Sequence, residues 1–128
     1  MKKINKVLIL GASSDIGHES IKYYLKNNWK VFGHFNKNNL KIKNKNLTQF
    51  KLDFLSPSKN IENKIKKLKK VKFDAIINLV GYIDNKKFLN FKIKDLEKSI
   101  RVNSIVPMYI IKELSSFMVK NKFGRILQ

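Results

Sequence analysis

The sequence predicts a doubly wound parallel α/β sheet with helices on both faces, a three-layer α/β/α arrangement. The first observation behind this prediction is that short apolar runs, typical of buried strands, alternate with segments whose apolar residues recur at helical spacing. The second is that the first apolar run ends in a turn bounded by Gly11 and Gly17, which leads into a helix. Right-handed crossovers between such strands favour the order 3-2-1-4-5 across the sheet.

The first strand is expected at residues 7–10, which are continuously apolar, as in a strand buried on both faces. After the glycine-bounded turn, Ile16, Ile21 and Leu25 mark one face of a helix that ends at residues 27–28. A second strand at residues 30–35 follows directly. These elements form a β-loop-α-β unit.

A run rich in Asn and Lys at residues 36–46 is interpreted as a loop, and the third strand is expected at residues 48–52. Between residues 57 and 70, Ile61, Ile65 and Leu68 recur at helical spacing, while lysines take most of the other positions. The lysines are interpreted as a solvated helix face rather than a membrane-surface patch.

The fourth strand is expected at residues 73–80 and is closed by Gly81. Helical turns at residues 95–101 precede a longer helix at residues 104–120, which is apolar nearly all round and holds Pro107 in its first turn. Such a helix needs a second partner besides its own sheet, so a homo-oligomer through residues 104–120 is expected. Residues 125–128 begin a fifth strand, at which the sheet is predicted to be incomplete.

The composition indicates one domain, residues 1–128, because 128 residues with 43% hydrophobic content lie in the single-domain range. Lys and Arg number 28 against 9 Asp and Glu, a formal net charge of +19. Only Arg101 and Arg125 are arginines, and arginine is the side chain that grips phosphate in a bidentate fork. A lysine-coated protein without specific nucleic-acid or membrane partners is therefore favoured over a nucleic-acid binder that uses the basic cluster at residues 64–72.

The chain has no cysteine, which excludes disulfides and thiolate metal sites and is compatible with a cytoplasmic location. The apolar run at residues 7–10 is too short for a signal peptide or a membrane span. The two histidines, His18 and His34, are not at metal-ligand spacing and are interpreted as surface or packing residues. No metal site is predicted.

The turn between Gly11 and Gly17 has the chemistry of a pyrophosphate site. A tight turn into a helix presents unpaired backbone N–H groups at the positive end of the helix dipole. The glycines let the ligand approach the backbone, and Ser13 and Ser14 could add hydroxyl donors. In a doubly wound sheet this turn lies at the carboxyl ends of the strands, where ligands bind.

The residues of this turn and of four later segments together resemble the amino-terminal half of a short-chain dehydrogenase/reductase. Residues 10–17, Leu-Gly-Ala-Ser-Ser-Asp-Ile-Gly, resemble the family's TGxxxGxG turn, with Leu10 in place of threonine and Asp15 in place of the middle glycine. Residues 74–81 resemble its D-x-x-V-N-N-A-G strand, residues 101–103 its V-N segment and residues 124–126 its G-R-I. The resemblance covers essentially the whole chain in order, and implies a Rossmann-like NAD(P)-binding domain.

The resemblance also implies roles for individual residues. Asp53, after the third strand, would contact the adenine amino group, and Asn103 is the one member of the family's catalytic set within the 128 residues, where it would hold a water in a proton relay. A structural role for Asn103, capping or bending a helix with its amide, stays open. The predicted cofactor-binding residues are Gly11, Ser13, Ser14, Asp15, Ile16, Gly17, Asn36, Lys37, Asp53, Asn78 and Gly81.

The family's remaining catalytic residues, a serine after the fifth strand and a YxxxK turn, would follow residue 128. Tyr82 and Lys86 have the YxxxK spacing, but they come directly after the fourth strand, so we interpret them as a coincidence. The predicted function is that of the cofactor-binding half of an NAD(P)-dependent oxidoreductase acting on a carbonyl or secondary alcohol. The alternative is a non-catalytic dinucleotide-binding remnant or interaction module.

The end of the second strand indicates which cofactor is preferred. NAD enzymes commonly place an acid there to bind the ribose 2′-hydroxyl. Residues 33–37 contain no acid, and Lys37 could pair with a 2′-phosphate. NADP(H) is therefore favoured over NAD(H).

Overall fold

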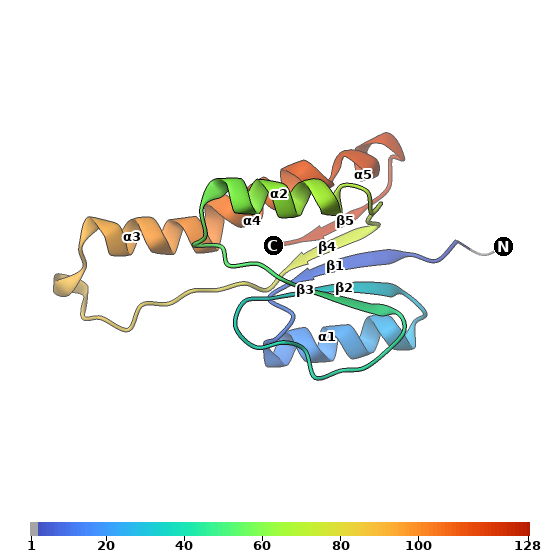
Figure 1. Ribbon diagram of the computed structural model, residues 1–128, viewed down its shortest axis with the longest axis horizontal. Coiled ribbons are helices and arrows are strands. Elements are labelled where there is room, and N and C mark those ends of the chain that lie inside the picture. The colour runs from blue at the N-terminus through green and yellow to red at the C-terminus, as the bar shows by residue number, and fades with distance from the viewer. Residues whose placement is uncertain (1–2) are drawn as a thin grey trace.

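Five parallel strands form one sheet in the order β3-β2-β1-β4-β5 in the computed structural model, which describes residues 3–128 (Figure 1). The order is the one predicted, and the predicted strand bounds lie within two residues of those observed. The strands are β1 (Lys6–Leu10), β2 (Lys30–Phe35), β3 (Leu47–Lys51), β4 (Ala75–Asn78) and β5 (Arg125–Leu127). The chain reverses its direction of travel across the sheet between β1 and β4, where ligands bind in this architecture.

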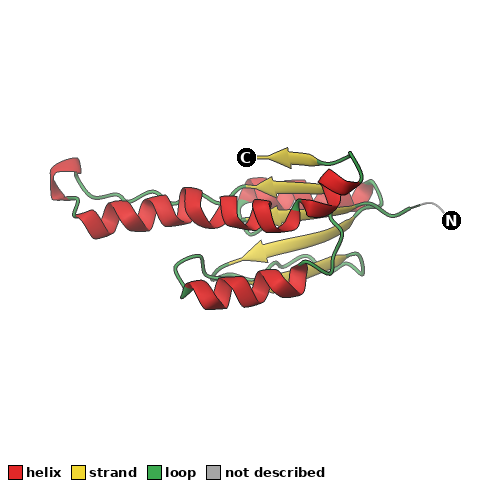
Figure 2. Cartoon of the chain, turned by 90° about the horizontal axis from the view of Figure 1, so that it is seen from above, coloured by secondary structure: helices red, strands yellow, loops and turns green. Residues whose placement is uncertain are grey.

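Helices cover both faces of the sheet, which confirms the three-layer α/β/α prediction (Figures 1 and 2). Helix α1 lies on one face, and α2, α4 and α5 lie on the other. Helix α3 extends beyond the carboxyl ends of the strands. The helical elements are α1 (Asp15–Lys26), α2 (Ser58–Leu68), η1 (Phe88–Asn90), α3 (Ile93–Ile100), η2 (Arg101–Ile105), α4 (Val106–Leu114) and α5 (Ser116–Lys120).

Strand β1 divides the core between the two faces, because successive side chains of a strand point to opposite sides. Val7 and Ile9 pack on the α1 side, whereas Leu8 and Leu10 pack on the side of α2 and α4. All four are fully buried, as the continuous apolar run predicted. The Asn/Lys-rich segment 36–46 has no regular structure, but Leu40 within it is buried on the α1 side, and its backbone N–H donates to Gln49 Oε1 at 2.9 Å.

The prediction of one separate helix at residues 104–120 was wrong at its start and in its continuity, whereas its predicted end at Lys120 is the end of α5. Helices α3, η2 and α4 run on without interruption from Ile93, and a break at Ser115 then separates the short α5. Pro107 is consequently inside a long helix and not in its first turn. It has no N–H for the carbonyl of Asn103, four residues earlier. The π-helical η2, in which the Val106 N–H donates to the Arg101 carbonyl, lies just before this proline and accommodates it.

Asp74 connects the amino-terminal ends of three strands. Its carboxylate is buried and accepts from the backbone N–H of Lys6 at 2.9 Å and from Lys3 Nζ at 2.5 Å. Its own carbonyl accepts from the Arg125 N–H at 3.1 Å, at the start of β5. One residue therefore connects β1, β4 and β5.

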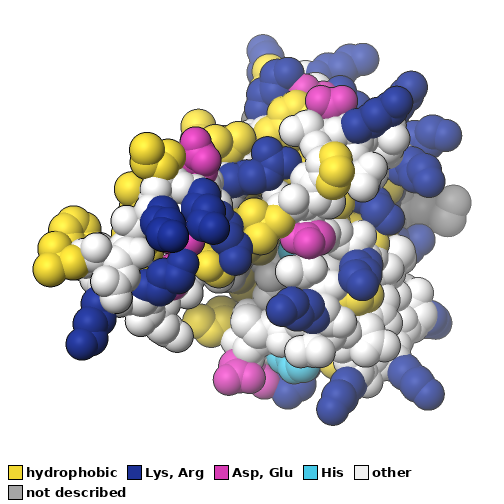
Figure 3. Space-filling view, turned by 60° about the vertical axis from the view of Figure 1, so that its left-hand side comes forward, with side chains coloured by type: hydrophobic (Ala, Val, Ile, Leu, Met, Phe, Trp, Pro, Cys, Tyr) yellow, Lys and Arg dark blue, Asp and Glu magenta, His cyan; other side chains and the backbone are white. Residues whose placement is uncertain are grey.

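Lysine side chains are spread over the surface rather than gathered in one patch on the face that Figure 3 shows. The same view shows hydrophobic side chains on the projecting tip, where Phe88 and Leu89 are exposed. A dispersed charge fits the interpretation of the lysines as a solvated coat. Between residues 3 and 128, no helix has the length and apolar character needed to cross a membrane.

Candidate functional site

A cavity of about 450 Å³ opens at the carboxyl ends of β1, β2, β3 and β4. Its walls are the glycine turn after β1, the ends of β2 and β3, the loop after β4 and one side of the long helix. The lining residues are Gly11, Ser13, Ser14, His34, Asn36, Lys37, Leu52, Asp53, Phe54, Leu55, Leu79, Val80, Gly81, Tyr82, Lys98 and Val102. The cavity therefore occupies the place where the sequence predicts a ligand.

The glycine turn is held by its own side chains and by close packing. Gly11 has a φ of 76°, and a Cβ there would lie 2.9 Å from the Leu79 and Val80 backbone. Ser14 caps α1 by accepting from the Gly17 N–H at 3.0 Å, and its hydroxyl donates to the Gly11 carbonyl at 2.9 Å. Thus Ser14 closes the turn and satisfies one of the first N–H groups of α1.

The structure brings seven of the eleven predicted cofactor-binding residues to this cavity. These are Gly11, Ser13, Ser14, Asn36, Lys37, Asp53 and Gly81. The other four do not line it: Asp15 and Ile16 are exposed in the first turn of α1, Gly17 is packed against the Ala12 backbone, and Asn78 accepts from the Val80 N–H at 3.1 Å. Asp15 thus points to solvent and leaves the capping to Ser14.

The loop that carries Asp53 is fixed from two sides. The Asp53 carboxylate accepts from the Leu55 N–H at 2.8 Å, which shapes the loop locally. From the long helix, the Arg101 guanidinium donates to the Phe54 carbonyl at 3.0 Å and to the Ser56 carbonyl at 2.8 Å. One of the chain's two arginines therefore holds the wall of the cavity, a role that its place beside the V-N segment did not suggest.

Asn103 holds the opposite wall. Its Oδ1 accepts from the Tyr82 N–H at 2.7 Å, and its Nδ2 donates to the Tyr82 carbonyl at 2.8 Å and to Ser99 Oγ at 3.3 Å. The amide thus pairs with the backbone of the loop after β4 as a neighbouring strand would. Arg101 and Asn103 are both in η2, so this π-helical turn anchors the two loops on either side of the cavity.

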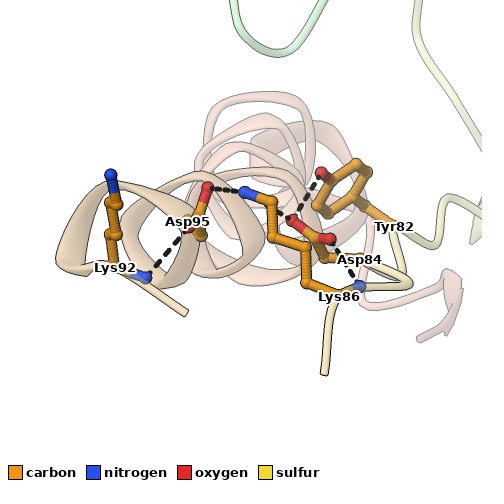
Figure 4. A network of polar contacts seen from close by, with 5 residues as sticks. All are labelled: Tyr82, Asp84, Lys86, Lys92 and Asp95. Atoms are coloured by element: carbon orange, nitrogen blue, oxygen red, sulfur yellow. Dashed lines mark hydrogen bonds and ion pairs between the residues drawn. The ribbon is translucent and has the colours of Figure 1, made fainter. Parts of the chain in front are cut away.

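Tyr82 and Lys86 do not form a tyrosine–lysine catalytic pair. The Lys86 ammonium contacts Asp95 at 2.6 Å and Asp84 at 3.7 Å, and the Tyr82 hydroxyl donates to Asp84 at 3.5 Å (Figure 4). The bond from Lys86 lowers the pKa of Asp95, and the same bond raises the pKa of Lys86. The network joins the loop after β4, which carries Tyr82, Asp84 and Lys86, to the start of α3. There the Asp95 carboxylate also accepts from the Lys92 N–H. This arrangement supports the interpretation of the spacing as a coincidence.

Sequence reasoning missed several lining residues. His34, Leu52 and Phe54 lie at or just beyond the carboxyl ends of strands, and Lys98 and Val102 lie on the long helix. The strand ends could have been found from the rule that they meet at the ligand site. Lys98 and Val102 could not, because their approach depends on the path of α3 beyond the sheet.

Comparison with known proteins identifies the family. The model of the family described as short chain dehydrogenase matches residues 5–128. The chain belongs to the short-chain dehydrogenase family. An uncharacterized oxidoreductase of Schizosaccharomyces pombe is 30% identical over 126 residues, which cover 95% of this chain and 43% of that protein.

Two solved structures of this family's fold show the same arrangement. A 4-hydroxyisoleucine dehydrogenase mutant complexed with NADH and succinate superposes with a TM-score of 0.82 and 30% identity, over 95% of this chain and 53% of that one. ElxO with NADP bound superposes with a TM-score of 0.77 and 22% identity, over 97% and 54%. The short-chain dehydrogenase described here thus spans about half the length of these relatives. The predicted family and its Rossmann-like fold are confirmed.

Proposed function

We propose that residues 1–128 are the nicotinamide dinucleotide-binding half of an oxidoreductase that moves hydride between the cofactor and a carbonyl or secondary alcohol. The observation that carries the proposal is the cavity at the strand ends, where the glycine turn, Asp53 and Lys37 face one space. The bound cofactor would supply the hydride.

The lining of the cavity supports an assignment of its parts. In the turn from Gly11 to Ser14, Ser13 offers its hydroxyl and its backbone N–H to a pyrophosphate. The N–H groups of Gly11, Ala12 and Ser14 are already bonded within the fold. Asp53 and Phe54, which both line the cavity, offer an acceptor and an apolar contact to adenine. The loop at Gly81 and Tyr82 lies on the other side of the turn and would flank the nicotinamide, with its backbone positioned by Asn103. Asn103 acts here as a positioning residue, in addition to the proton-relay role that the family resemblance implies.

The family's serine and YxxxK set is not among these 128 residues, so the chain by itself is proposed to bind dinucleotide without efficient turnover. The test is to titrate the chain with NADPH and NADH by cofactor fluorescence, and then to follow NADPH oxidation with a panel of aldehydes and ketones. Saturable binding without turnover is the expected result. Robust turnover would overturn this account of where catalysis resides.

Lys37 is proposed to favour NADP(H) over NAD(H), because this cationic residue lines the cavity just beyond β2. Replacing Lys37 by alanine is expected to weaken NADPH binding roughly tenfold, which corresponds to the loss of one charge-assisted hydrogen bond. NADH binding should change less than twofold. The control is Lys41→Ala, an exposed lysine of the same segment that does not line the cavity. Equal losses for NADH and NADPH would rule out this basis for the preference.

A homo-oligomer through the long helix is also proposed. Ile105 and Met108 are 55% and 64% exposed on consecutive turns of η2 and α4, and a second copy could cover them. Replacing both with glutamate is expected to weaken self-association on the order of 100-fold, because burying unpaired carboxylates is costly. Analytical ultracentrifugation gives the measurement, with Tyr23→Glu on α1 as the control. A monomeric wild-type chain at all concentrations would contradict the proposal.

A further inference from the structure

His34 lies at the end of β2 against the floor of the dinucleotide cavity, with only 3% of its surface exposed. Its ring stacks on that of Phe54, with centroids 4.8 Å apart and planes inclined by 17°. The ring of Phe50 lies on another side, with its centroid at 5.6 Å. These aromatic neighbours fix the imidazole in one orientation.

Both ring nitrogens of His34 are used. Nδ1 accepts from the Gly11 N–H at 3.1 Å, and Nε2 lies 2.7 Å from the Leu52 carbonyl oxygen. A carbonyl can only accept and an N–H can only donate, so Nε2 carries the hydrogen and Nδ1 does not. The His34 carbonyl also accepts from the Ala12 N–H at 2.8 Å. A neutral ring thus joins the first glycine of the turn to Leu52, which follows β3 and directly precedes Asp53.

We propose that His34 is a positioning residue for the dinucleotide site, and that protonation of its ring releases the glycine turn and weakens dinucleotide binding. The proposal rests on the proposed function of the cavity. It adds control of this binding by pH.

Protonation would place a second N–H on Nδ1, directly against the Gly11 N–H. The turn has little room to relax toward the loop after β4, because even a Cβ on Gly11 would lie only 2.9 Å from the Leu79 and Val80 backbone. The two donors can separate only if the turn moves toward the ligand or the ring leaves its stack. Either movement disturbs the surface that the pyrophosphate would contact.

Burial lowers the pKa of His34 from its ordinary value near 6.5, and the Leu52 carbonyl opposes this in part. The folded protein therefore holds the ring neutral at pH 7. Binding should be at full strength above about pH 6.5 and should be lost as the pH falls through the lower pKa of the folded state. Four ionisable side chains border the same cavity, and none of them pairs with the ring within the described residues: Lys37, Asp53, Tyr82 and Lys98.

The test measures the dissociation constant of NADH between pH 5.5 and 8. NADH is the probe because it lacks the 2′-phosphate, a group that itself titrates in this range. Wild-type affinity is expected to fall roughly tenfold for each pH unit below the pKa of His34. His34→Asn keeps an acceptor near Gly11 and cannot titrate, so its profile should be flat. His34→Phe keeps the stack, loses both hydrogen bonds and should bind weakly at every pH.

His18→Asn is the matched control, because it makes the same replacement at the chain's other histidine, which does not line the cavity, and its profile should follow the wild type. A flat wild-type profile, or a pH dependence retained in His34→Asn, would overturn the proposal. A second readout is needed in case NADH does not bind at any pH, a result that would defeat the proposed function. Imidazole ¹⁵N NMR should then show the Nε2–H tautomer. On acidification, the protection factor of the Gly11 amide against hydrogen exchange should fall more in the wild type than in His34→Asn. The Nδ1–H tautomer, or equal exchange in both proteins, would overturn the positioning role.

Discussion

Replacing Gly11 by alanine is expected to destabilise the fold by about 3 kcal/mol and to abolish dinucleotide binding. An L residue in the left-handed region costs about 1–2 kcal/mol, and forcing a methyl group into a packed site costs about as much again. The first cost applies because the φ at Gly11 is 76°. The second applies because the added Cβ would lie 2.9 Å from the Leu79 and Val80 backbone. Urea unfolding followed by circular dichroism measures the loss.

The control for this prediction is Gly81→Ala in the same cavity. A Cβ at Gly81 meets nothing within 4 Å, and its φ is not in the left-handed region. Its free energy of unfolding should stay within about 0.5 kcal/mol of the wild type. If the two variants lose the same stability, the close approach of Gly11 to β4 is not what shapes the turn.

Asp74→Ala is expected to cost about 3 kcal/mol of stability. The substitution leaves the Lys6 N–H without its acceptor and opens a space where the carboxylate is buried, and an orphaned buried donor alone costs about 1–3 kcal/mol. Asp74→Asn keeps an acceptor and should lose less. Lys3→Ala should lose under about 1 kcal/mol, because the Lys3 side chain is 63% exposed. Thermal and urea unfolding measure the stability of the three variants. An Asp74→Ala protein as stable as Lys3→Ala would refute the role assigned to the buried carboxylate.

The strands and their order could be predicted because each carries a strong local signal. Residues 7–10 are apolar without interruption, and the glycine turn that follows has few structural alternatives. The sheet order then followed from crossover handedness, a general rule that needs no side-chain detail. Because the strands are parallel, Lys37 and Asp53, which follow the second and third strands, lie at one end of the sheet, where the cavity lies.

The long helix could not be predicted, because its course depends on contacts between distant segments. The sequence places Pro107 well in a first helical turn, whereas the structure continues the helix back to Ile93 through the π-helical η2. The bonds from Arg101 and Asn103 to the two loops of the cavity hold this turn in place. Likewise, the spacing of His34 in the sequence gave no sign of its bonds to Gly11 and Leu52, which form only when three strand ends meet.

The most direct test of the central claim is calorimetric titration of the folded 128-residue chain with NADPH and with NADH, alongside Asp53→Ala. The account predicts saturable binding of one dinucleotide per chain, weakened by the loss of the Asp53 carboxylate at the adenine end of the cavity. Circular dichroism on the same sample establishes that the chain is folded. A folded chain that shows no saturable binding to either dinucleotide would contradict the claim that the cavity at the strand ends is a dinucleotide site.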